Sequence, residues 1–264
     1  SNFPEMTDNL STAKSPQQMF GAICKSYFAQ SIGADPHKIC MVSIMPCLAK
    51  KTEAVRPEFS ENGNPDVDIV LSTRELARLI KLKDINLAEL PESEFDDPLG
   101  ESTGAAVIFG STGGVIEAAV RTAYEIQTGK PLPKLDFEEL RGFEGIRVAT
   151  IDVDGIPLKI AVAHGLGNAK ILCDEVRAGN PNGYHAIEVM ACKGGCIGGA
   201  GQPYHHGDEQ VLLKRIYEID KNMPIRKSHE NQSVLALYRD YYGEPGSELA
   251  HHQLHTHYIP QDKY

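Results

Sequence analysis

Apolar and polar positions along the first half of the chain alternate between helical and strand-like spacing. Ser15-Pro16-Gln17-Gln18 has the residues typical of a helix start, and apolar residues follow at helical intervals over residues 19–28. Residues 38–45 form an apolar run of strand length, which predicts a buried strand. A second strand is predicted over residues 68–71, and Ser72-Thr73-Arg74-Glu75 predicts a helix that begins with a capping box.

The second half of the chain continues this alternation. A glycine-rich loop over residues 110–114 leads into a predicted helix, and two predicted strands are joined by a turn at Asp154-Gly155. Ser228 is expected to cap a final long helix. The other elements predicted here are a helix over residues 115–127, strands over 146–153 and 158–163, a helix over 167–178 and a strand over 184–190.

Alternating helices and strands predict the α/β fold class. We expect two lobes with mostly parallel sheets flanked by helices, and a link between the lobes near residues 130–145. The active site is expected in the cleft between the lobes.

The composition fits a folded protein of a reducing compartment. The chain has 264 residues, of which 41% are hydrophobic, so it can bury a substantial core. Its net charge of −10 repels phosphate backbones, which argues against a nucleic-acid partner. No apolar run approaches the roughly 20 residues that span a bilayer, so we expect no membrane segment. Six cysteines are too few for a disulfide scaffold and suit a cytoplasmic protein that keeps thiols for metal binding or catalysis.

Two cysteine segments follow directly after predicted strands. The first is Met-Pro-Cys-Leu-Ala-Lys-Lys-Thr-Glu, residues 45–53. The second is Met-Ala-Cys-Lys-Gly-Gly-Cys-Ile-Gly-Gly-Ala-Gly-Gln-Pro, residues 190–203. Sites in open α/β sheets lie beyond the carboxyl ends of the strands, so both segments lie where a site is expected.

Cys192 and Cys196 have neighbours that suit an iron–sulfur cluster. Glycines let backbone N–H groups approach a bound anion closely, and thiolates bind iron. Zinc is an alternative, but its cysteine pairs are usually more closely spaced, and no second compact Cys/His pair accompanies this one. A catalytic thiol and two buried cysteines in a glycine turn are the remaining interpretations.

The two cysteine segments resemble the second and third signature motifs of the FeFe hydrogenases. The resemblance covers nearly the whole chain and implies that it is the C-terminal part of the family's large-subunit catalytic domain. Further matching segments are Leu-Ser-Thr-Ala-Lys-Ser-Pro-Gln-Gln at residues 10–18, Ser-Thr-Arg-Glu-Leu at 72–76, Phe-Gly-Ser-Thr-Gly-Gly at 109–114 and Arg-Lys-Ser-His-Glu-Asn at 226–231.

In that family the cofactor is a 4Fe–4S cluster joined to a diiron subcluster that carries CO, cyanide and a bridging dithiolate. The resemblance implies that Cys47, Cys192 and Cys196 hold the cluster, with Cys196 as the bridging thiolate. Lys50 matches a lysine that donates a hydrogen bond to a cyanide. The implied reaction is the reversible reduction of protons to H2. The other implied site residues are Pro16, Gln17, Met45, Met190 and Phe109 in the diiron pocket, Glu53 of the second motif in a structural role, and Ser11 on the proton path.

The family's first motif carries the fourth cluster cysteine and a proton-shuttling cysteine, and it is expected upstream of Ser1. We therefore expect a missing N-terminal hydrogenase segment or a companion subunit to supply both, and a ferredoxin-like carrier to exchange electrons. Without that piece, the chain is expected to be inactive. Cys24, Cys40 and Cys173 are poor substitutes, because their positions are those of apolar core residues.

Two other functions stay open. A non-catalytic relative would bind only an iron–sulfur cluster, for cluster assembly or hydrogen sensing. A chain without any cluster would be a folded scaffold. Lys50, Met45 and Met190 favour the hydrogenase, because a cluster alone needs neither a cyanide donor nor a diiron cavity.

Overall fold

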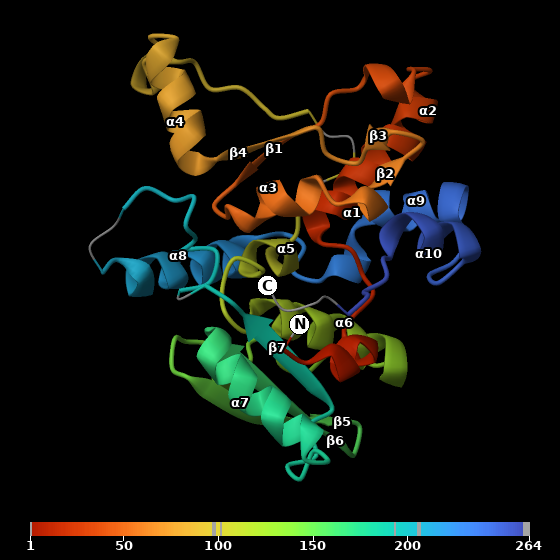
Figure 1. Ribbon diagram of the computed structural model, residues 1–264, viewed down its shortest axis with the longest axis vertical. Helices are drawn as coiled ribbons and strands as arrows, with labels where there is room; N and C mark the ends of the chain where they lie inside the picture. Colours follow the sequence, from red (N-terminus) through yellow and green to blue (C-terminus); the bar gives the residue numbers. More distant parts are fainter. Residues whose placement is uncertain (1, 97–98, 101, 193, 205–206, 261–264) are drawn as a thin grey trace. The chain divides into compact units, whose positions relative to one another are not determined.

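The computed structural model describes residues 2–96, 99–100, 102–192, 194–204 and 207–260. The chain divides into two compact units, whose helices and strands are labelled in Figure 1. Unit 1 comprises Ser1–Leu99 and Ser233–Tyr264, and unit 2 comprises Gly100–Gln232. Residues 130–145, where the sequence predicted a link between lobes, lie inside unit 2.

Unit 1 consists mainly of helices with short strands between them. α1 runs through a wider turn at Cys24–Phe28 into α2, and α9 continues through a similar turn at Tyr238–Tyr242. The helices are α1 (Pro16–Ile23), α2 (Ala29–Ser31), α3 (Ala49–Ala54), α4 (Thr73–Leu82), α9 (Gln232–Leu237) and α10 (Glu248–Leu254). The strands are β1 (Val42–Met45), β2 (Ser60–Glu61), β3 (Asn64–Pro65) and β4 (Ile69–Ser72).

The start of α1 agrees with the sequence prediction. The Oγ of Ser15 accepts a hydrogen bond from the backbone N–H of Gln18, which satisfies one of the free donors at the helix start. The helix then packs against α10. Burial of each large apolar side chain in this core contributes about 1.5–3 kcal/mol. The core residues are Ile23, Leu237, Tyr242, Ala250 and Leu254.

β1 and β4 form a parallel pair that ends at the first cysteine segment. The register pairs Val42 with Ile69 and Met45 with Ser72. Ser72 then caps α4: its Oγ accepts from the N–H of Glu75, and its own N–H donates to the Glu75 carboxylate at 2.8 Å. The predicted capping box is therefore confirmed. The second pair, β2 and β3, is antiparallel.

The prediction of a buried strand over residues 38–45 is wrong in length and in burial. Pro36–Lys38 forms a helical turn, and the backbone N–H of Met41 donates to the Asp68 carboxylate at 2.7 Å. The strand therefore begins only at Val42. In a sheet of two described strands one face stays uncovered, and Val42 and Ile44 are 46% and 49% exposed.

Unit 2 is built around a three-stranded sheet. β5 (Ile146–Val153) and β6 (Ile156–His164) form an antiparallel hairpin with the predicted turn between them, and β7 (Ala186–Met190) pairs with β6 in parallel. Two of the four strand pairings among the described residues are thus parallel. The helices are α5 (Gly104–Ile108), α6 (Gly114–Thr128), α7 (Leu166–Arg177) and α8 (Glu209–Asn222).

β6, the middle strand of this sheet, is packed on both faces along its second half, and α7 lies across one of these faces in Figure 1. Ile160 and Val162 of β6 belong to a core cluster that includes residues of α6. Ala161 and Ala163 of the same strand pack against α7. Successive side chains of a strand point to opposite faces, so β6 packs against α6 on one face and against α7 on the other. This arrangement confirms the α/β class.

The predicted final helix is present over residues 232–242 and ends at Gly243, but its predicted start at Ser228 is wrong. Ser228–Glu230 forms one short turn of 3-10 helix, and α9 begins at Gln232. The side chain of His229 in this turn hydrogen-bonds to Thr122 and Glu125 of α6. Two helices of unit 2, α5 and α8, were not predicted from the sequence. Among the helices in the described ranges, none combines the length and the apolar sequence that a bilayer crossing requires.

Candidate metal centre

The first cysteine segment joins β1 to α3 in unit 1. Met45 ends the strand, Cys47 lies in the turn, and α3 begins at Ala49. Cys47 is a half-buried free thiol. Met45 packs against a buried apolar cluster that includes Val70 of the neighbouring strand. The strand end that precedes the cysteine is therefore anchored in the core of unit 1.

A hydrogen-bond network joins α3 to the start of α1. The Nζ of Lys50 donates to both carboxylate oxygens of Glu53 at 3.0 Å, and the Oγ of Ser15 donates to the same carboxylate at 2.8 Å. Gln17 is 6% exposed; its Oε1 accepts from Ser43 Oγ at 2.7 Å, and its Nε2 donates to Glu53 at 3.4 Å. The structure thus brings together Gln17, Lys50 and Glu53, which the sequence proposed separately.

Two other candidate residues of unit 1 lie near the start of α1. Pro16 is the first residue of the helix and is exposed. Ser11 is also exposed, and its Oγ accepts from the N–H of Ala13 at 3.4 Å within its own segment. Pocket lining by Pro16 and proton transfer by Ser11 stay predictions.

The second cysteine segment forms a tight glycine turn in unit 2, directly after β7. The N–H of Gly195 donates to the carbonyl of Cys192 at 3.1 Å, and the N–H of Gly199 donates to the carbonyl of Cys196 at 3.1 Å. Gly195 has a φ of +67°, and a Cβ there would lie 2.9 Å from the carbonyl oxygen of Gly110. This close approach requires glycine. It lets the N–H of Cys196 donate to the Gly110 carbonyl at 3.0 Å.

His164 holds the middle of the cysteine turn. It is the last residue of β6 and is 6% exposed. Its Nε2 accepts from the N–H of Gly194 at 3.2 Å, and its Nδ1 lies 3.0 Å from the Oγ1 of Thr112. Because Nε2 accepts a hydrogen bond, the proton of the neutral ring is assigned to Nδ1, which donates to Thr112. The turn is thereby tied to the end of the neighbouring strand.

Glu188 anchors the glycine-rich loop that receives Cys196. Its carboxylate accepts from the N–H of Gly113 at 2.7 Å and from that of Ile116 at 2.8 Å, at the start of α6. Burial raises the pKa of the Glu188 carboxyl group, and these N–H groups offset part of that effect. The loop is therefore fixed to β7, the strand that leads into the cysteine turn.

Sequence reasoning did not identify His164 or Glu188. A glutamate inside an otherwise apolar strand and a histidine at the end of another are unusual enough to attract notice. Their partners, however, could not be read from the chain, because they lie on other elements.

The two remaining candidate residues belong to unit 2. Met190 ends β7, and its carbonyl accepts from the N–H of Gly165 at 2.8 Å. Phe109 follows α5 and packs against a buried cluster that includes Ile108. It also lines an apolar pocket of about 790 Å³, whose other walls come mainly from α6 and the β5–β6 hairpin. Lining of a diiron cavity by either residue stays a prediction.

The six cysteines differ in how well they suit iron, and Cys40, expected at an apolar core position, is exposed instead. Burial raises the pKa of the Cys24 thiol to about 11 and also raises that of Cys173, so both resist forming the thiolate that iron binds. Cys47, Cys192 and Cys196 are partly exposed in turns after strands, and glycines keep the second turn free of side chains. This donor set fits an iron–sulfur cluster. Cys192 and Cys196 share one turn of unit 2, and Cys47 belongs to unit 1.

Two family models match the chain. Residues 1–200 match the model described as iron only hydrogenase large subunit, C-terminal domain. Residues 211–261 match the model described as iron hydrogenase small subunit.

The chain is similar to proteins of two kinds. It is 58% identical to the NADP-reducing hydrogenase subunit HndD of Solidesulfovibrio fructosivorans, over 99% of this chain and 45% of that protein. It is 32% identical to the cytosolic Fe-S cluster assembly factor narfl of Xenopus tropicalis, over 96% of this chain and 54% of that protein. The chain spans about half the length of these relatives.

A solved structure has the same fold. It is a variant of the apo FeFe-hydrogenase from Chlamydomonas reinhardtii, with a TM-score of 0.84 and 41% sequence identity. The match covers 98% of this chain and 72% of that chain.

Proposed function

Because this chain belongs to the family of the C-terminal domain of iron-only hydrogenase large subunits, we propose that it forms part of a hydrogenase catalytic domain. The proposed reaction is the reversible reduction of protons to H2. The proposed cofactor is a 4Fe–4S cluster joined to a diiron subcluster with CO, cyanide and a bridging dithiolate. When bound, these groups supply the electron transfer and the reduction chemistry.

The observation that carries the proposal is the glycine turn between two cysteines that form no disulfide. Cys192 and Cys196 are the proposed cluster ligands from this turn, with Cys196 also bridging to the diiron subcluster, and Cys47 is the proposed ligand from unit 1. The close contact of Gly195 with Gly110 supports the proposal, because it fixes the backbone directly before Cys196. A turn that is rigid before the metal binds pays less ordering entropy on binding.

The other side chains are proposed to shape the pocket. The ammonium of Lys50 has three donors, and Glu53 holds it in place by contacts to both carboxylate oxygens. Its remaining donor capacity is the proposed source of a hydrogen bond to a cyanide. Gln17 fixes the start of α1 against the same carboxylate. Met45, Met190, Pro16 and Phe109 are the proposed water-excluding wall, and Ser11 the proposed proton donor.

The proposed partners complete this site. A further hydrogenase segment or companion subunit would supply the fourth cluster cysteine and the proton-shuttling cysteine, and a ferredoxin-like carrier would exchange electrons. The name of the relative, a hydrogenase subunit, and the match to a small-subunit model support such an association. The six free thiols support a reducing, cytoplasmic location.

The second candidate function is non-catalytic iron–sulfur cluster assembly. The observation that favours it is the 32% identity to a protein named as a cytosolic assembly factor. The 58% identity to a hydrogenase subunit favours the first function. The presence of Lys50 after Cys47 also favours it, because a cluster without cyanide needs no such donor.

Infrared spectroscopy of the protein isolated anaerobically with its partner polypeptides distinguishes these functions. Iron and acid-labile sulfide are measured first. CO and cyanide bands together with H2 production support the hydrogenase, cluster iron without these bands supports the assembly protein, and absence of iron contradicts both. In Lys50→Ala the cyanide bands should shift. The matched control is Lys51→Ala, which removes a neighbouring lysine paired with Glu75 and should leave the bands unchanged.

A further inference from the structure

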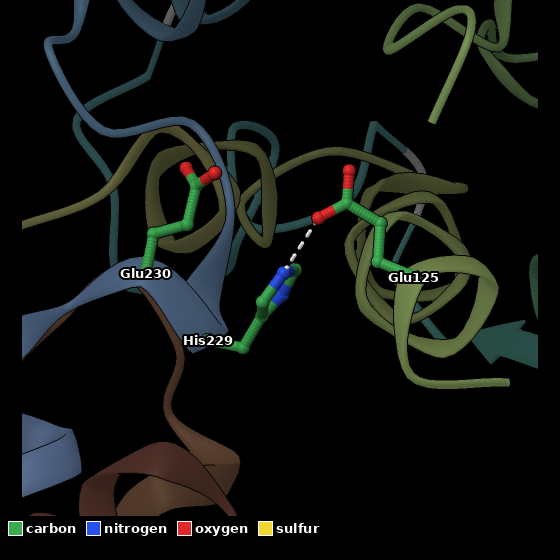
Figure 2. Close-up of side chains that lie close together, drawn as sticks. All are labelled: Glu125, His229 and Glu230. Atoms are coloured by element: carbon green, nitrogen blue, oxygen red, sulfur yellow. Dashed lines mark hydrogen bonds and ion pairs between the residues drawn. The ribbon is translucent and has the colours of Figure 1, made fainter. Parts of the chain in front are cut away.

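The short turn at Ser228–Glu230 brings a second group of metal-ligating side chains together in unit 2. Figure 2 shows His229 between the carboxylates of Glu125, on α6, and Glu230. One possible ligand atom from each of the three lies within 4.8 Å of the others. The group includes no cysteine, and the proposed hydrogenase reaction does not use it.

Hydrogen bonds already orient these side chains. The Nε2 of His229 lies 2.8 Å from a carboxylate oxygen of Glu125, and its Nδ1 lies 3.1 Å from the Oγ1 of Thr122. The ammonium of Lys227 bonds to Glu125 at 2.9 Å and to Glu230 at 2.7 Å. A single positive charge thus lies between two carboxylates.

We propose that this group is a divalent-cation site, in which Glu125, His229 and Glu230 bind the ion in exchange for the ammonium of Lys227. Two carboxylate oxygens and one imidazole nitrogen are ligands that suit ions such as Mn²⁺, Fe²⁺ and Zn²⁺. With the ion on Nε2, the Nδ1–H of His229 donates to Thr122. Metal-binding histidines usually have such a partner on the second ring nitrogen, because it fixes the tautomer and the ring orientation.

The ligands are accessible from solvent. The three side chains line an open pocket of about 450 Å³. The side chain of Glu230 is 42% exposed, so an ion can reach the group from solvent.

Charge balance explains why an ion would replace the lysine. Two carboxylates and one ammonium leave a net charge of −1, whereas two carboxylates and a divalent ion are neutral. Lys227 has a flexible side chain that can move away once the ion has bound. The competing interpretation is a purely structural ion-pair network that ties the turn to α6.

Binding of Mn²⁺ to the chain without cofactors tests the proposal independently of hydrogenase activity. Mn²⁺ prefers oxygen and imidazole ligands to thiolates, so the cysteines do not compete. The fall in the EPR signal of free Mn²⁺ gives the affinity, and pulsed EPR detects coupling to an imidazole nitrogen. We expect one such site. Lys227→Ala should bind Mn²⁺ about tenfold more tightly, because a competing positive charge is gone.

Loss of a ligand provides the opposite test. Glu230→Gln should weaken Mn²⁺ binding about tenfold or more, and His229→Gln should abolish the nitrogen coupling. Glu218→Gln, which changes an exposed glutamate paired with Lys214 on α8, should leave binding unchanged. If Glu230→Gln binds as the unchanged protein does, or if Lys227→Ala binds no more tightly, the group is an ion-pair network and the proposal is wrong. Glu230 is partly exposed, so the Glu230→Gln variant is expected to fold. Its Mn²⁺ affinity therefore tests the proposal even if His229→Gln does not fold.

Discussion

Replacing Gly195 by alanine tests whether the cysteine turn depends on its close approach to the glycine-rich loop. An added Cβ would lie 2.9 Å from the carbonyl oxygen of Gly110 and 3.2 Å from the backbone nitrogen of Thr112. The left-handed conformation, with a φ of +67°, costs an L-residue about 1–2 kcal/mol. The loop must also shift, which weakens the Cys196–Gly110 hydrogen bond, worth about 1 kcal/mol. We expect the free energy of unfolding of unit 2 to fall by about 2–3 kcal/mol.

Gly179→Ala is the matched control in the same unit. Gly179 has a φ of +95°, but an added Cβ would meet nothing within 4 Å. It therefore carries the conformational cost of about 1–2 kcal/mol without the contact. Both substitutions restrict the unfolded chain equally, so their difference reports the close approach alone. Urea unfolding followed by amide hydrogen exchange gives both values. Equal losses in the two variants would refute the reasoning.

Three further substitutions test interactions within unit 2. Arg121→Met removes a fully buried guanidinium that bonds to two buried carboxylates, so we expect the free energy of unfolding in urea to fall by about 3–5 kcal/mol. Burial raises the pKa of Asp136, but hydrogen bonds, first from Arg141, outweigh it and lower the pKa to about 2. The folded pKa lies below the unfolded value of about 3.9, so this stabilisation is present above about pH 4 and is lost as the pH falls toward 2. Asp136→Asn should flatten the acid side of the Tm profile, and an unchanged profile would contradict this assignment. His164→Leu removes the buried acceptor of the Gly194 N–H, so we expect the free energy of unfolding in urea to fall by about 1–3 kcal/mol. The iron content after reconstitution should also fall, and full iron binding would count against the positioning role of His164.

Sequence prediction succeeded where a few neighbouring residues decide the structure. The capping box of Ser72 with Glu75 needs only four consecutive residues, and the structure contains it. The hairpin turn at Asp154-Gly155 is equally local, and it joins β5 to β6 as predicted. Such signals depend on backbone donors and turn conformations that distant residues change little.

Prediction failed where a backbone or polar group hydrogen-bonds to a residue that is distant in the sequence. The carboxylate of Asp68 accepts the N–H of Met41, 27 residues away, and the strand predicted from residue 38 begins only at Val42. His229 bonds to α6, and the final helix, predicted to start after Ser228, begins only at Gln232. Neither contact leaves a periodic signal in the sequence.

The candidate site shows the same division. The spacing of Cys192, Cys196 and their glycines identified the turn itself. The residues that hold the turn and its supporting loop, His164 and Glu188, bond to groups 30 and 75 residues away, so their partners could not be predicted. The network around Lys50 was predicted only as separate residues, because it depends on α1 and α3 lying together.

Cys47, Cys192 and Cys196 are proposed to hold one cluster. EPR of the reduced protein, reconstituted anaerobically with its partner polypeptides, measures this most directly when each thiol is removed in turn. Cys→Ser at any of the three positions should abolish the same cluster signal or change its g-values, whereas Cys24→Ser, at a buried thiol, should leave it unchanged. If Cys47→Ser retains the signal and the full iron content, the three cysteines do not share a cluster.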